Sequence, residues 1–241
     1  MNVENMNKKL RRMYEEHWDS LKSFKENNKL SSPLLMKVPE CYTEQKTKLF
    51  VVGQQTNGWF EGNSVEELIN IYERFDFGKY CCDTYFWDGV RKLGEKLEIK
   101  KGCIVWSNLN RMDDPKESGK CPKKKVEKDM AEKFGFLLRE EINICRPDIL
   151  VFFTGPDYDE NIKWIFSEKK SEVEFNELNN QFSIEGRELA TVDKDKLNID
   201  VKTKAYRTYH PGYLFRNKNP ERLGKKGEKI IQSILSDFKA E

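Results

Sequence analysis

Four short apolar segments constrain the fold of this 241-residue chain more than any other feature. Each is too short for a helix, is rich in valine, isoleucine and aromatic residues, and is almost continuously apolar instead of alternating with polar residues. Strands that are buried on both faces of a parallel sheet have this composition. The pattern therefore predicts four buried parallel strands, at residues 49–52, 103–106, 149–153 and, less strongly apolar, 205–209.

Helical patterns separate these segments, and several have recognisable ends. Ser64 and Glu67 form a capping box that predicts a helix through about residue 75. Asp83 is placed to cap a second helix, and a third ends before Arg146, which precedes a proline. The Asn-Pro pair at 219–220 begins a fourth, and a leading helix is expected over 5–27. Strands that alternate with helices predict an α/β fold with right-handed crossovers.

Residues 167–200 interrupt this alternation. Val173 and Phe175 are separated by a polar residue, and so are Phe182 and Ile184 after a polar stretch. Two short alternating segments of this kind predict a β-hairpin, inserted before the last strand.

The composition is that of a folded protein outside the membrane. Aromatic residues make up 12% of the chain, which argues against disorder. No apolar run approaches the roughly 20 residues that span a bilayer, and residues 1–12 lack the apolar segment of a signal peptide. We therefore expect a cytoplasmic protein with one α/β domain over 1–241, in which 1–47 form a helix and lead-in. The six cysteines include no Cys-x-x-Cys pair and are expected to be reduced.

Candidate site residues follow the predicted strands. Ligands of open parallel sheets bind beyond the carboxyl ends of the strands, so these positions are expected to meet at one edge. Polar and aromatic side chains gather there: Gln54, Gln55, Asn57, Trp59 and Phe60 after the first strand, Asn108 and Arg111 after the second, and His210, Tyr213, Leu214, Phe215 and Arg216 after the fourth.

Each of these positions also has an ordinary structural explanation. Gly53 suits a strand-to-loop turn, Asn108 can satisfy a local turn, and a His-Pro-Gly turn such as that at His210 is often structural. Of the adjacent pair Trp59 and Phe60, one is expected in the core, which leaves the other to stack on a ring.

Charge is distributed unevenly along the chain. Residues 201–230 contain nine Lys or Arg and two Glu, whereas residues 157–200 contain twelve acidic and six basic residues. A basic stretch beside the strand ends favours a polyanionic partner such as a phosphate backbone. A solvated helix face with scattered lysines is the alternative explanation.

The post-strand segments together resemble the uracil-DNA glycosylase superfamily. The segment LFVVGQQ at 49–55 is similar to its glycine turn, IVWSN at 104–108 to the strand that ends in a base-reading Asn, and HPGYL at 210–214 to its His-Pro motif. The resemblance covers about 48–238. It implies a three-layer α/β/α sandwich around a four-stranded parallel sheet of order 2-1-3-4, with DNA, single- or double-stranded, as partner. Neither a metal nor a cofactor is expected, because the four-cysteine iron–sulfur pattern of some branches is missing.

The resemblance implies hydrolysis of the N-glycosidic bond of a deaminated base, uracil or a related one, that is rotated out of DNA. His210 would stabilise the departing base, and Asn108 and Gln54 would bind the base edge. Trp59 or Phe60 would stack on the ring. Leu214 occupies the position of the family's wedge into the duplex, a role that Tyr213 or Phe215 can share, and Arg111 and Arg216 would contact DNA.

One position departs from the family pattern. Gln55 stands where many members have Asp or Asn to position the attacking water, and Asn57 is the nearby candidate to replace it. A neutral amide orients water but does not act as a base. Two alternatives therefore stay open: a catalytically weak or inactive nucleic-acid-binding module of the same fold, which Gln55 favours, and an unrelated α/β enzyme acting on a small nucleotide or nucleoside.

Overall fold

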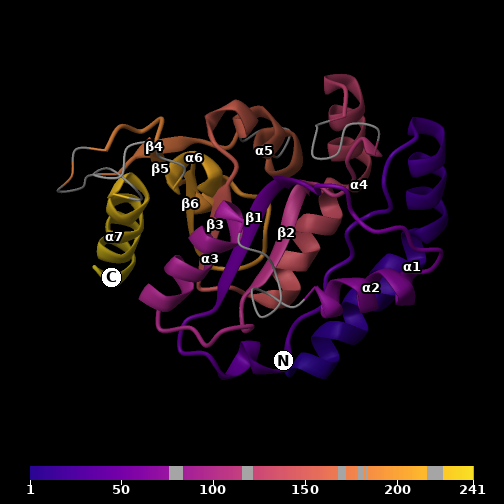
Figure 1. Ribbon diagram of the computed structural model, residues 1–241, viewed down its shortest axis with the longest axis horizontal. Coiled ribbons are helices and arrows are strands. Elements are labelled where there is room, and N and C mark those ends of the chain that lie inside the picture. Colours follow the sequence, from indigo (N-terminus) through magenta and orange to yellow (C-terminus); the bar gives the residue numbers. More distant parts are fainter. Residues whose placement is uncertain are drawn as a thin grey trace.

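A mixed six-stranded sheet runs through the computed structural model of the protein (Figure 1). The structure describes residues 1–75, 84–115, 122–167, 172–178, 182, 184–215 and 225–240. The strands are β1 (Leu49–Gln55), β2 (Val105–Asn110), β3 (Ile149–Phe153), β4 (Phe175–Glu177), β5 (Leu189–Val192) and β6 (Lys204–Thr208), in the order β2-β1-β3-β6-β5-β4.

The α/β class predicted from the sequence is confirmed. Each of the four apolar segments overlaps a strand, although β2 begins at Val105 and not at 103. β1 pairs in parallel with β2 and β3, as β3 does with β6. Every residue of β3 is buried, as expected for a strand with helices on both sides. β2 extends to Asn110, so Asn108 lies inside the strand and not after it.

The expected sheet of four parallel strands is wrong, because the inserted hairpin extends it. β5 pairs antiparallel with β6, and β4 pairs antiparallel with β5. The hairpin also differs from the predicted one, since Phe175 pairs with Val192 and not with the segment around Ile184. Leu189 and Val192 are buried, so this later apolar segment takes the place beside β6 and satisfies a backbone edge that would otherwise be open.

The helices are α1 (Val3–Asn28), α2 (Val65–Arg74), α3 (Tyr85–Lys96), α4 (Lys124–Cys145), α5 (Asp159–Phe166), α6 (Pro211–Phe215) and α7 (Lys225–Lys239), with short 3₁₀ helices η1 (Glu40–Glu44), η3 (Pro156–Tyr158) and η4 (Lys194–Lys196). The short helices α5 and α6 have no counterpart in the sequence-based prediction. The predicted start of the last helix at 219–220 lies outside the described residues.

Two of the predicted helix ends are confirmed. The Glu67 amide donates to Ser64 Oγ over 3.1 Å at the start of α2. α4 ends at Cys145, and the next residue, Arg146, adopts a left-handed conformation with φ 49°. The cap of α3 is different from the predicted one. Thr84 accepts the hydrogen bond from the Trp87 amide, whereas Asp83 lies outside the described residues.

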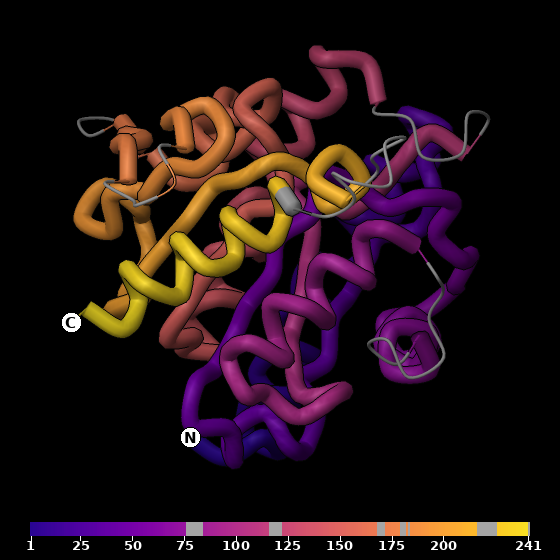
Figure 2. The backbone as a smooth tube through the Cα atoms, turned by 60° about the vertical axis from the view of Figure 1, so that its left-hand side comes forward, coloured from indigo at the N-terminus to yellow at the C-terminus, as the bar shows by residue number. Residues whose placement is uncertain are grey.

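Helices cover both faces of the sheet. Phe152 and Phe153 are neighbours in β3 and therefore point to opposite faces. The Phe152 ring packs against Phe166 of α5, and the Phe153 ring packs against Phe86 of α3. α7 lies beside α3, and α4 lies beside α5 and α1 (Figure 2).

A disulfide joins Cys41 of η1 to Cys103, with their Cα atoms 5.3 Å apart. The expectation of reduced cysteines is therefore wrong for this pair. The two residues meet because each precedes one of two neighbouring parallel strands, β1 and β2, at the amino end of the sheet. Cys145 is a buried free thiol. The other three cysteines lie outside the described residues.

No helix within the described ranges is both long enough and apolar enough to cross a membrane.

Candidate functional site

A cleft with a volume of about 1200 Å³ opens where β1 and β2 end. Segments that are far apart in the sequence contribute to it: the end of β1 and the loop after it, β2, the start of α3, and the turn into α6. Nine of the predicted site residues line it: Gln54, Gln55, Asn57, Trp59, Phe60, Asn108, His210, Tyr213 and Leu214.

Gly53 and Asn108 are paired neighbours in β1 and β2. A Cβ atom at position 53 would lie 2.3 Å from Oδ1 of Asn108 and 3.5 Å from the Phe86 ring. Asn108 is only 4% exposed, so its side chain has little room to move elsewhere. The glycine is therefore required because the amide of Asn108 lies against the backbone of β1.

The two glutamines at the end of β1 are held by the segment that follows β3. Gln54 Nε2 donates to the carbonyl oxygen of Thr154 over 2.7 Å. Gln55 Oε1 accepts a hydrogen bond of 2.7 Å from the hydroxyl of Tyr158 in η3. Both amides therefore have a set orientation at the floor of the cleft. The sequence pattern placed no function on Tyr158, since its contact with Gln55 spans 103 residues.

His210 is oriented by its own turn and by α3. The Gly212 amide donates to Nδ1 of His210 over 3.0 Å, so a neutral ring carries its proton on Nε2. The imidazole stacks on Phe86, with ring centroids 5.4 Å apart and an interplanar angle of 29°. Gly89 lets α3 lie close to the turn that carries His210, because a Cβ atom at position 89 would lie 2.6 Å from Pro211 Cβ.

The adjacent aromatic residues Trp59 and Phe60 have different environments. Trp59 is 8% exposed and packs edge-on against Phe75 and Trp106, with ring centroids 5.4 Å and 5.9 Å away. Phe60 is 55% exposed. Phe60 is therefore the ring of this pair that a planar ligand can cover, while Trp59 forms part of the wall.

Asp113 anchors the loop that carries Asn57. It is fully buried, and its carboxylate accepts hydrogen bonds of 2.7 Å from the hydroxyl of Thr56 and from the Gly58 amide. Its own amide donates to Ser31 Oγ over 2.9 Å. Sequence reasoning missed Asp113, because it lies 55 residues from Gly58 and belongs to no local motif.

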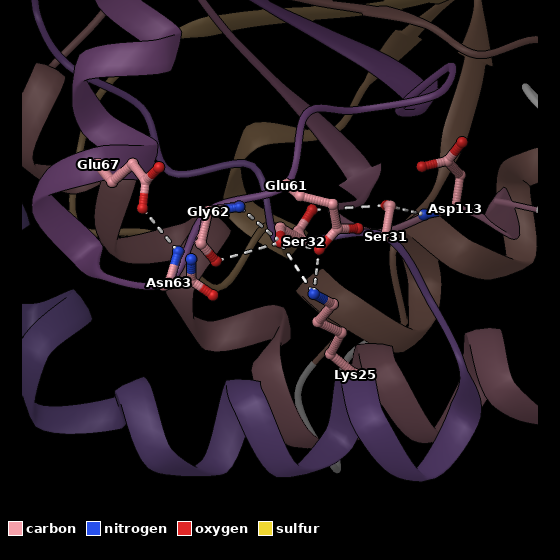
Figure 3. A network of polar contacts seen from close by, with 8 residues as sticks. All are labelled: Lys25, Ser31, Ser32, Glu61, Gly62, Asn63, Glu67 and Asp113. Atoms are coloured by element: carbon pink, nitrogen blue, oxygen red, sulfur yellow. Dashed lines mark hydrogen bonds and ion pairs between the residues drawn. The ribbon is translucent and has the colours of Figure 1, made fainter.

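A second network holds the far end of the same loop (Figure 3). Ser32 Oγ donates to Glu61 over 3.0 Å and accepts from the Gly62 amide over 3.2 Å, and Lys25 of α1 pairs with Glu61. The Asn63 amide donates to Glu67 over 2.8 Å. The loop around Phe60 is therefore fixed at one end by Asp113 and at the other by Ser32 and Lys25.

Three predicted DNA contacts are corrected by the structure. Arg111 is 3% exposed, donates to the Leu34 carbonyl over 2.8 Å and pairs with Glu141 at 3.2 Å, so it is an interior residue. Phe215 is buried close to Gly89 and Gly227, where any Cβ would lie less than 3.0 Å from its ring. Leu214 lines the cleft but is 3% exposed, so it does not project as a wedge. Arg216 lies outside the described residues.

The described residues that line the cleft carry little formal charge. Among the described residues that line it there is no Asp or Glu, and Lys226 is the one lysine or arginine. Its Nζ lies 5.3 Å from the centre of the Tyr213 ring and pairs with Glu188. Within the described ranges no group of three or more His, Cys, Asp or Glu side chains is arranged to hold a metal ion. The cleft thus offers amides, an imidazole and aromatic rings, a set that suits a planar ligand with hydrogen-bonding edges.

Models of known protein families do not match this chain, and a comparison with curated proteins finds no significantly similar sequence.

Proposed function

We propose that the cleft binds a nucleobase and that the protein hydrolyses the N-glycosidic bond of a deaminated base in DNA, as a divergent relative of the uracil-DNA glycosylases. The observation that carries the proposal is the meeting of Gln55, Asn108 and His210 in one cleft. They come from β1, from β2 and from the turn after β6, across 155 residues. The parallel strands β2-β1-β3-β6, covered by helices on both faces, support the family's fold.

His210 is suited to stabilise the leaving base. Hydrolysis adds water to the sugar C1′ and transfers negative charge to the departing base before the base is protonated. A neutral imidazole with its proton on Nε2 can donate a hydrogen bond from Nε2 to a base oxygen. One preorganised donor of this kind contributes about 10²–10³ in rate. Asn108 offers both a donor and an acceptor, which matches the edge of a pyrimidine.

A second candidate function is base binding without hydrolysis. It is favoured by the absence of a carboxylate among the described residues of the cleft lining and by Gln55, whose Oε1 already accepts from Tyr158. Loss of a general base reduces turnover by about 10²–10⁴. Under this hypothesis the protein would recognise a modified base in DNA and leave it in place.

Oligonucleotides that contain uracil, hypoxanthine or xanthine, single-stranded and in duplex, followed by alkaline cleavage, test the proposal. We expect strand breakage at one of these bases, and breakage that is about 10²–10³-fold slower with the variant His210→Ala. Salt-sensitive binding of DNA without any abasic product would favour the binding function. If no abasic product forms and no salt-sensitive binding is found, both functions are contradicted. An enzyme that acts on small nucleotides would then be favoured.

A further inference from the structure

Among the described residues, the large exposed aromatic side chains lie around one cleft. In the described part of the chain four large hydrophobic side chains are exposed: Met1, Phe60, Tyr85 and Tyr213. The three aromatic ones all line the cleft. They belong to different elements, namely the loop after β1, the first turn of α3, and α6. Clustered exposed rings of this kind mark a binding surface.

Contacts hold the rings of Tyr213 and Phe60 in place, and a helix cap fixes the backbone at Tyr85. Tyr213 lies against Tyr209, with ring centroids 4.4 Å apart, and Lys226 lies on its ring. Tyr209 in turn accepts a hydrogen bond of 3.0 Å from Arg187 Nε. Tyr85 begins a helix whose cap is Thr84, and Phe60 packs on the edge of Trp59. A ring that is already ordered loses little conformational entropy when a ligand covers it.

A single base does not account for this surface. The cleft, at about 1200 Å³, is larger than the roughly 300–1,000 Å³ of pockets for drug-sized ligands. In a duplex the faces of the neighbouring bases are covered by stacking, so a single flipped base would leave rings at the rim without a partner. Unpaired bases expose both faces, and any base stacks on an aromatic ring.

From this we infer that Phe60, Tyr85 and Tyr213 form a stacking platform for the unpaired bases that flank the target nucleotide, so that the substrate is a DNA strand with several consecutive unpaired nucleotides. The inference rests on the proposed function for the identity of the ligand. It adds to that function the number of unpaired nucleotides in the substrate and the residues that stack on them.

Fluorescence anisotropy with labelled oligothymidylate of roughly a dozen nucleotides, a usual length for single-strand sites, tests the platform. Further probes are gapped duplexes, in which either one thymidine or three consecutive thymidines of one strand have no opposite nucleotide. The longer gap has three unpaired bases because the platform has three rings. Affinity should increase from the fully paired duplex to the single-nucleotide gap, the three-nucleotide gap and the oligothymidylate. Equal affinity for the two gapped duplexes would overturn the inference.

Variants separate the rings from the rest of the site. Phe60→Leu and Tyr213→Leu keep an apolar side chain and remove the ring, and each should weaken binding of the oligothymidylate by about tenfold. Tyr213→Phe keeps the ring and should bind like wild type. Trp164→Leu is the matched control, because Trp164 also lies beneath a lysine, 4.7 Å from Lys124 Nζ, but outside the cleft. Unchanged binding by Tyr213→Leu, or equal losses in Tyr213→Leu and Tyr213→Phe, would contradict the platform.

The two proposals fail in different ways. Ring-dependent binding without an abasic product on any substrate would support the platform and reject the hydrolysis. Abasic product from a duplex at the same rate with wild type and Tyr213→Leu would support the hydrolysis and reject the platform. Circular dichroism of each variant checks that the exposed substitution leaves the fold intact.

Discussion

Oδ1 of Asn108 lies 2.3 Å from the position that a Cβ atom would occupy on Gly53, the residue paired with it across the sheet. This contact couples the backbone of β1 to the side chain that the proposed function assigns to base recognition. It also explains the glycine inside a strand, where glycine usually weakens the pairing. The glycine is thus explained by a side chain 55 residues further along the chain.

Gly53→Ala should therefore displace Asn108. Overpacking of this kind costs about 1–3 kcal/mol in the free energy of unfolding, measured by urea denaturation. The double variant Gly53→Ala/Asn108→Ala should recover most of that loss, since the obstructing amide is gone. If the alanine costs the same with and without Asn108, then the contact is not the cause.

His210→Ala should reduce excision about 10²–10³-fold while binding of DNA stays close to wild type, because the donor acts on charge that develops during cleavage. The measurement is the rate of abasic product under single-turnover conditions together with anisotropy. His17→Ala is the matched control, since His17 is the only other histidine and packs on Phe136 of α4. Equal rates for the His210 variant and wild type would remove His210 from the mechanism.

Arg111→Met should destabilise the protein by about 3–5 kcal/mol, because it leaves the buried carboxylate of Glu141 without its cation. Glu141 also accepts a hydrogen bond of 2.7 Å from Tyr14, and burial together with the charge of Glu141 raises the pKa of Tyr14 well above its usual value. The double variant Arg111→Met/Glu141→Leu should regain much of the stability. Lys8→Ala, which breaks an exposed pair with Glu4, should leave the free energy of unfolding close to that of wild type. Weakened DNA binding by a fully folded Arg111→Met protein would contradict the interior role.

Asp159 should make stability depend on pH in the acidic range. Burial raises its pKa from 3.8 to about 6, even though its carboxylate pairs with Arg207 at 2.9 Å. Between these two values the folded protein binds more protons at this site than the unfolded chain, so the free energy of unfolding falls as pH rises from about 4 to 6. Asp159→Asn should remove that component from urea denaturation curves recorded across the range. A slope that is the same in both proteins would exclude Asp159 as its source.

The disulfide should contribute about 2–4 kcal/mol, since it closes a loop of 62 residues in the unfolded chain. Cys41→Ser/Cys103→Ser should lower the free energy of unfolding by that amount, and a reducing agent should have the same effect on wild type but none on the variant. Mass spectrometry of unreduced peptides identifies the linked pair. A wild-type protein that is insensitive to the reducing agent would contradict a stabilising cross-link.

Local signals in the sequence were sufficient for the main elements. The continuous apolar segments at 49–52 and 149–153 identified buried strands, because a residue buried on both faces has no position left for a polar side chain. Ser64 identified the start of α2, since a capping side chain acts on amides three residues away. The rule that ligands bind at the carboxyl ends of parallel strands predicted that Gln55, Asn108 and His210 would lie at one edge of the sheet, and all three line the same cleft.

Only the tertiary structure decided the rest, because it depends on contacts between residues that are distant in the chain. The hairpin joined the sheet as β4 and β5 because the outer edge of β6 was available to it. The local sequence around Arg111 is typical of a surface cation, but its side chain is buried in an ion pair with Glu141 of α4. The spacing of the cysteines did not predict a disulfide. Cys41 and Cys103 come together because β1 and β2 lie side by side in the sheet. Patterns within a short segment of sequence determine which residues are buried and where helices are capped. Which distant residue a side chain contacts depends on how the elements pack together.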